Sequence, residues 1–232
     1  MIVYDGIDLE SVAPVRIEDI RVSPIEENAV SRPRAICAGS EFVRMRYGTR
    51  TVAVTFAVQD DNRTTRQSSL LNISQWAKSD KEYKLELPNY PDLYLMAVCT
   101  NKPEPSYRQW WEAKLRLVFT CFDNPFWTSV AEKSVSCGTQ FYAFGDAPPL
   151  VRIERTLSES ASNQSYGLDS NTITFSTIPT GDLVIDLNRQ TAQVGNSSIM
   201  ANYAASSHFL IPRTGQQTIT GTGTVKYRER WQ

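Results

Sequence analysis

The chain has 232 residues, of which 41% are hydrophobic and 21% charged, and its formal net charge is −1. These values are ordinary for globular proteins, so they predict buried cores and exclude a wholly disordered chain. They also argue against a protein that holds nucleic acid through bulk charge, because that requires clustered Lys and Arg.

Strand patterns dominate the first half of the chain. Apolar and polar residues alternate in four segments, namely 16–25, 50–59, 93–100 and 111–122. In the second of these, every other residue from Val52 to Val58 is apolar and would lie on one face. We expect these strands to form an antiparallel sheet with one face on a core.

The segment 26–50 interrupts this pattern and is rich in arginine. An irregular excursion of this length is unusual in a small β-domain, and long loops of this kind often carry function. A solvated hairpin with charged faces is an equally good interpretation, since edge strands are commonly charged.

One helix is predicted between the strands. The Asp-Asp-Asn run at 60–62 can cap its N-terminus. Leu70, Ile73 and Ala77 then follow at helical spacing. The predicted helix covers about 64–78, with its apolar face against the sheet.

A second unit is predicted to begin near residue 130, after the Asn-Pro break at 124–125. Short strands follow, separated by Gly, Asn, Ser and Pro, at the spacing typical of a β-sandwich. The sequence therefore predicts a mainly β protein with two domains, 1–130 and 131–232.

Motifs that would carry catalysis or bind a cofactor are not found. His208 is the single histidine, and the sequence holds no GxSxG, no phosphate-binding glycine loop and no CxxC pair. Paired acids could serve a glycosidase, but they are common on any surface. No apolar run approaches the roughly 20 residues that cross a membrane. We expect no enzyme activity, no cofactor, no metal and no membrane insertion.

The segment 181–195 could be read as a cation loop, because it holds Asp182, Asp186 and Asn188 at close spacing. A calcium loop needs oxygen ligands at alternate positions, and Val184 stands between the two acids. The alternation of Leu183, Ile185 and Leu187 with polar residues instead predicts a β-hairpin with its acids on the outer face.

The order of these elements resembles the distal tail proteins of long-tailed, non-contractile bacteriophages. The resemblance is carried by "YDGIDL", "VRIEDIRVSPI", the long excursion, "VAVTFAV", a helix ending in "ISQW", "LELPNYPDLYLMAVC" and "AKLRLVFTCFDNPFW". It covers residues 1 to about 127 well, and it extends to 130–232 in pattern rather than in individual residues.

This resemblance implies a structural virion protein that forms a hexameric ring at the tail tip. Residues 1–130 would make the ring and leave a channel for DNA, which passes without specific binding. Residues 131–232 would form a galectin-like β-sandwich that points outward. The implied partners are the tail tube, tape-measure, tail-tip and receptor-binding or adhesin proteins. The implied location is the virion, with the host cytoplasm as the place of assembly.

The family's extended arm corresponds to segment 28–50, so the resemblance implies that four arginines lie near a neighbouring subunit, namely Arg32, Arg34, Arg44 and Arg46. Two other functions stay open. One is a carbohydrate-binding protein for host adsorption, although the second domain holds only Trp231 as a tryptophan. The other is the tail tube subunit, which usually has one domain with a long hairpin.

Overall fold

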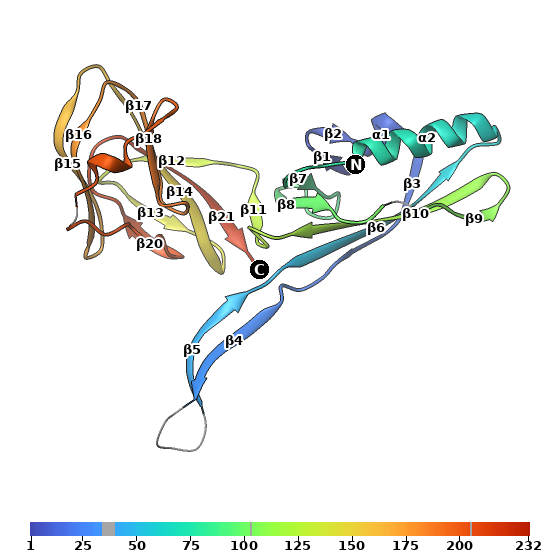
Figure 1. The fold of residues 1–232 in the computed structure, drawn as a ribbon, viewed down its shortest axis with the longest axis horizontal. Coiled ribbons are helices and arrows are strands. Elements are labelled where there is room, and N and C mark those ends of the chain that lie inside the picture. Colours follow the sequence, from blue (N-terminus) through green and yellow to red (C-terminus); the bar gives the residue numbers. More distant parts are fainter. Residues whose placement is uncertain (34–39, 103, 205) are drawn as a thin grey trace. The chain divides into compact units, whose positions relative to one another are not determined.

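The computed structural model describes residues 1–33, 40–102, 104–204 and 206–232. The chain divides into two compact units, Met1–Trp127 together with Gln232 (unit 1) and Thr128–Trp231 (unit 2). Both consist mainly of antiparallel strands (Figure 1), which confirms the predicted fold class.

Unit 1 combines a sheet with one long helix. In chain order its elements are β1 (Val3–Tyr4), β2 (Ile7–Asp8), α1 (Leu9–Val12), β3 (Val15–Val22), β4 (Glu27–Pro33), β5 (Ser40–Tyr47), β6 (Arg50–Gln59), α2 (Arg63–Trp76), β7 (Tyr83–Glu86), β8 (Leu93–Cys99), β9 (Ser106–Gln109) and β10 (Glu112–Cys121), with β11 (Trp127–Ser129) at the boundary. The strands that alternate most clearly in sequence, β6 and β10, pair along ten residues each.

The central part of this sheet has the order β3-β6-β10, and β8 joins the end of β10 to β7 and β1. The inward side chains of β6 form its core, with Val52, Phe56 and Val58 fully buried. Tyr4, Trp76 and Phe119 meet edge to face or tilted, with ring centroids 5.1–6.2 Å apart. These rings join the N-terminal hairpin and α2 to the sheet.

Local sequence explains the turns and the helix boundaries. The β1–β2 hairpin turns at Asp5-Gly6, both at positive φ (53° and 76°), which is the backbone that a two-residue type I′ turn requires. Asn62 caps α2 by accepting from the backbone N–H groups of Thr64 and Thr65. The helix covers 63–76 rather than 64–78, and the single turn α1 was not predicted.

Unit 2 is a sandwich of short strands around its own core. Its elements are β12 (Lys133–Ser136), β13 (Gln140–Ala143), β14 (Ala147–Leu157), β15 (Ala161–Leu168), β16 (Asn171–Ile178), β17 (Gly181–Asp186), β18 (Thr191–Val194), β19 (Ser197–Ser198), the 3-10 turn η1 (Met200–Asn202), β20 (Gly215–Thr218) and β21 (Thr224–Trp231). One layer has the order β19-β18-β17-β14-β21-β12, and the pairs β15-β16 and β13-β20 are separate. Tyr166, Phe175 and Ile185 are fully buried in the core of unit 2.

Candidate assembly surfaces

Residues capable of catalysis or metal binding are dispersed. Within the described ranges, no three side chains of His, Cys, Asp or Glu come together to hold a metal ion. His208 is exposed, and its backbone N–H donates to the carbonyl of Thr172 at 2.9 Å. No helix in the described part of the chain has the length and apolar character needed to cross a bilayer.

The described cysteines are free thiols. Cys121 is fully buried on β10, and Cys99 and Cys137 are partly buried. Burial raises the pKa of Cys121 to about 12, so this thiol stays protonated at neutral pH. A protonated, inaccessible thiol is a poor nucleophile, so Cys121 acts as a small apolar side chain of the core.

The segment 181–195 is the β17–β18 hairpin. Leu183, Ile185 and Leu187 are buried, which confirms the strand interpretation. Asp186 accepts from the backbone N–H groups of Asn188 and Arg189 in the turn, at 3.0 and 2.9 Å. The Asn188 side chain accepts from the Val151 N–H at 2.7 Å and donates to the Pro149 carbonyl at 3.0 Å. The polar groups that suggest a cation loop therefore stabilise the β17–β18 turn and bind it to β14.

The arginine-rich excursion forms the two-stranded hairpin of β4 and β5, drawn in Figure 1 as a narrow ribbon. Among the described residues these two strands pair with each other and with no other strand. Arg32 lies on β4, Arg44 and Arg46 lie on β5, and Arg34 falls outside the described residues. The backbone register pairs Val30 with Arg44 and Asn28 with Arg46, and it shifts between Val30 and Ser31.

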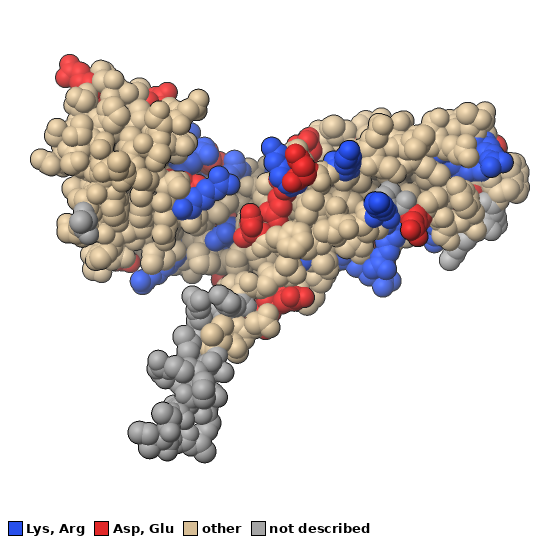
Figure 2. All heavy atoms as spheres, in the orientation of Figure 1, with Lys and Arg blue, Asp and Glu red and all other residues tan. Residues whose placement is uncertain are grey.

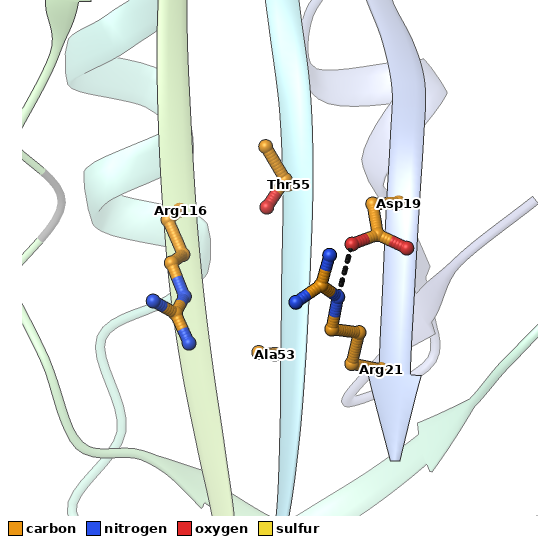
Figure 3. A pocket seen from close by; sticks show the side chains of 5 residues that line it. All are labelled: Asp19, Arg21, Ala53, Thr55 and Arg116. Atoms are coloured by element: carbon orange, nitrogen blue, oxygen red, sulfur yellow. Dashed lines mark hydrogen bonds and ion pairs between the residues drawn. The ribbon is translucent and has the colours of Figure 1, made fainter.

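The outward face of β3, β6 and β10 is a second candidate surface of unit 1. Its middle strand presents short side chains, and the strands on either side present long charged ones. A hollow on this face is lined by Asp19, Arg21, Ala53, Thr55 and Arg116 (Figure 3). The sequence does not indicate this hollow, because its lining residues come from three strands that only the sheet brings together.

Charges of both signs are mixed on the visible surface. In Figure 2 basic and acidic side chains lie next to one another. On the outward face of unit 1, Arg16 pairs with Glu18 and Glu112 at 3.2 and 3.3 Å. In unit 2, Arg152 pairs with Glu132 at 3.1 Å and with Glu154 at 2.7 Å. This mixing fits the near-zero net charge.

Two aromatic side chains of unit 2 are exposed side by side. Tyr142 and Phe144 are each more than half exposed, with ring centroids 4.6 Å apart. Lys133 places its ammonium 5.4 Å from the centroid of Phe144 and pairs with the buried carboxylate of Glu229 at 2.7 Å. An exposed ring pair beside a fixed cation is a candidate contact surface.

Comparison with known proteins finds similarity at the level of the fold. No protein-family model matches the chain, and no curated protein matches its sequence. The structure is similar to that of the Dit protein (gp 19.1) of phage SPP1, described as a paradigm of the hub adsorption apparatus in phages that infect Gram-positive bacteria. The TM-score is 0.80 at 17% identity, and the match covers 100% of this chain and 98% of that one.

A second similar structure is the baseplate of phage P2 in its activated conformation with Ca. Here the TM-score is 0.51 at 9% identity, and the match covers 96% of this chain and 92% of that one. Both matches include the two units of the chain. The chain therefore has the fold of phage tail hub and baseplate proteins along its whole length.

Proposed function

We propose that this chain is a structural protein of a phage tail hub. In this proposal six copies form a ring at the distal end of the tail, which joins the tail tube to the tail-tip and adhesion apparatus. The single observation that carries the proposal is the match to SPP1 Dit over the full length of both chains, with a TM-score of 0.80. A match over two successive units supports a shared role more than a match over one common sandwich would.

The two units take different parts in this proposal. Residues 1–130 form the ring and leave a channel through which DNA passes without specific binding. Residues 131–232, a galectin-like sandwich, point outward toward receptor-binding or adhesin proteins. The tail tube, tape-measure and tail-tip proteins contact the ring. The protein acts in the virion, is assembled in the host cytoplasm, and needs no catalytic group for this role.

Mass measurement and microscopy of the purified chain test the ring. We expect light scattering to give six times the 26.2 kDa mass of the chain, and negative-stain images to show rings of uniform size with six-fold symmetry. Long tubes would instead favour a tail tube subunit. Monomers at all concentrations, also in the presence of the tail tube protein, would contradict the ring.

The arginines of the β4–β5 hairpin are proposed to lie near a neighbouring subunit. Arginine suits such a surface because its guanidinium pairs carboxylates bidentately and stacks on rings. Replacing Arg44 and Arg46 together by Glu should shift the hexamer toward smaller species in light scattering. Arg189→Glu, in an exposed turn of unit 2, is the matched control. A hexamer that survives deletion of 30–48 would refute the hairpin contact while leaving the ring intact.

Carbohydrate binding by unit 2 is the second candidate function. The observation that favours it is the exposed Tyr142–Phe144 ring pair, because sugars stack on such rings. A glycan array probed with the full chain tests it. Binding that is lost in Tyr142→Ala and kept in Ile211→Ala, another exposed apolar position, would support a sugar site. No binding to host wall polysaccharide would exclude it.

A further inference from the structure

The outward face of the β3-β6-β10 sheet forms a groove along its middle strand. Ala53 and Thr55 of β6 make the floor of its open part. On β10, Arg116 lies directly opposite Thr55, and on β3, Asp19 lies opposite it from the other side. Short side chains between longer ones produce a depression that runs with the strand.

Ion pairs close the groove at the level of Ala57. Lys114 on β10 pairs with Glu18 on β3, so this contact crosses over the middle strand. Arg16 joins the same group by pairing with Glu18 and with Glu112. The pKa of Glu18 is lowered, mainly by the hydrogen bond from Lys114. Ala57 beneath them is fully buried.

The groove stays open at the next two outward positions of β6, Thr55 and Ala53. Asp19 pairs with Arg21 on its own strand, with Oδ2 and Nε 2.6 Å apart. Across the groove, the Arg116 side chain is exposed and makes no ion pair or hydrogen bond with any described residue. Figure 3 shows the guanidinium group of Arg116 over β10 and that of Arg21 reaching from β3 toward β6. The opening thus holds two arginines and one acid.

We propose that this hollow, lined by Asp19, Arg21, Ala53, Thr55 and Arg116, binds one Asp or Glu carboxylate from an extended segment of a protein partner. Its net charge of one positive unit matches a single carboxylate. The guanidinium of Arg116 can donate two parallel hydrogen bonds to that group. The Thr55 hydroxyl adds a donor from the floor. The inference concerns unit 1 alone and does not depend on ring formation.

A nucleic-acid backbone fits this groove less well than a single carboxylate. Phosphates follow one another closely along a strand and bind where several Lys and Arg are free. Of the four basic residues along the groove, Arg16, Arg21 and Lys114 are already paired with acids. The acids Glu18, Asp19 and Glu112 lie on the same surface. A row of phosphates would meet these acids, whereas one carboxylate meets only the open arginine position.

Chemical protection of arginine in the full-length protein tests the proposal. Phenylglyoxal modifies free guanidinium groups, and mass spectrometry gives its rate at each arginine. Two probes differ in one group: acetyl-Ser-Gly-Glu-Gly-Ser-amide and the same peptide with Gln. We expect the Glu peptide to slow modification of Arg116 at least threefold at saturation and the Gln peptide to have no effect. Arg63 and Arg189, both exposed, should react at unchanged rates.

Substitutions at Asp19 and at Arg21 should shift this protection in opposite directions. Asp19→Asn removes the acid of the hollow, so half-protection should need about tenfold less Glu peptide. Arg21→Gln leaves that acid unpaired, so half-protection should need about tenfold more. Far-UV circular dichroism checks that both variants fold.

Three results would overturn the proposal. Equal protection by the Glu and Gln peptides would show that the charge is not recognised. Protection by a thymidine tetranucleotide at a lower concentration than the Glu peptide would assign the hollow to phosphates. An Arg116 that fails to react without any probe would show that the hollow is not open.

Discussion

At the scale of single residues, two kinds of contact hold the β17–β18 hairpin in unit 2, namely the burial of its inward side chains and the hydrogen bond from the Val151 N–H to Asn188. The inward positions Leu183, Ile185 and Leu187 follow from period two, because only one strand face can meet the core. The role of Asn188 does not follow, since its partner Val151 is 37 residues away in sequence. A side-chain contact at that separation depends on how β14 and β17 are placed.

Replacing Asn188 by Ala should destabilise unit 2. The buried Val151 N–H would lose its acceptor, which costs roughly 1–3 kcal/mol. Hydrogen exchange at the Val151 amide should therefore become faster, and the unfolding temperature should fall. Asn196→Ala, in the exposed turn that follows β18, is the matched control and should change stability by less than about 0.5 kcal/mol. Unchanged exchange at Val151 would mean that this bond carries no stability.

The buried thiol of Cys121 should make unit 1 sensitive to alkaline pH. Its folded pKa of about 12 lies above the ordinary value of 9.0 for a cysteine thiol, so the unfolded chain releases this proton first as the pH rises. The stability from this group is complete below pH 9 and is lost between 9 and 12. At pH 10 the expected loss of stability is on the order of 1 kcal/mol relative to pH 8.

Urea unfolding followed by tryptophan fluorescence measures this effect, because four of the five tryptophans lie in unit 1. The Cys121→Ala variant is less stable at every pH, since it leaves a cavity. The test is the difference in the free energy of unfolding between pH 8 and pH 10, which should be smaller in the variant by on the order of 1 kcal/mol. The same pH difference in both proteins would rule out Cys121 as its source.

At the scale of elements, the periodicity of apolar residues predicts the long strands and the helix, but it does not predict short turns or bulges. The predicted strand at 50–59 is β6 with the same bounds, and the predicted helix is α2 shifted by one or two residues. The turn α1 is too short to show a period. The bulge between Ile17 and Asp19 places Glu18 opposite no residue of β6, and nothing in the alternation of 16–25 indicates it.

The N-cap of α2 gives a test at this scale. Asn62→Ala removes the acceptor for the N–H groups of Thr64 and Thr65, which should lower the free energy of unfolding of unit 1 by about 1 kcal/mol. Asn72→Ala makes the same chemical change on the exposed side of the helix, where Ala has the better helix propensity. It should be neutral or slightly stabilising. Equal losses in both variants would mean that the cap does not hold the helix.

At the scale of the whole molecule, the order of strands and helix along the chain indicates the fold better than any short motif does. The similarity to hub proteins extends over both units, yet the identity to SPP1 Dit is only 17%. Such folds tolerate wide substitution when apolar positions stay inside, as in β6 and β17. Trp110 and Tyr107 lie 71% and 57% exposed in the β9–β10 hairpin. Composition alone cannot separate a buried ring from an exposed one.

The division into two units, each with its own core, predicts that ring formation belongs to unit 1 alone. A fragment of residues 128–232 should fold and remain a monomer in light scattering, because its apolar core residues are enclosed within unit 2. The full chain at the same concentration should form the hexamer. Circular dichroism and dispersed amide NMR signals provide the control that the fragment is folded. A folded fragment that assembles by itself would move the ring contacts to unit 2, and would contradict the proposed role of residues 1–130.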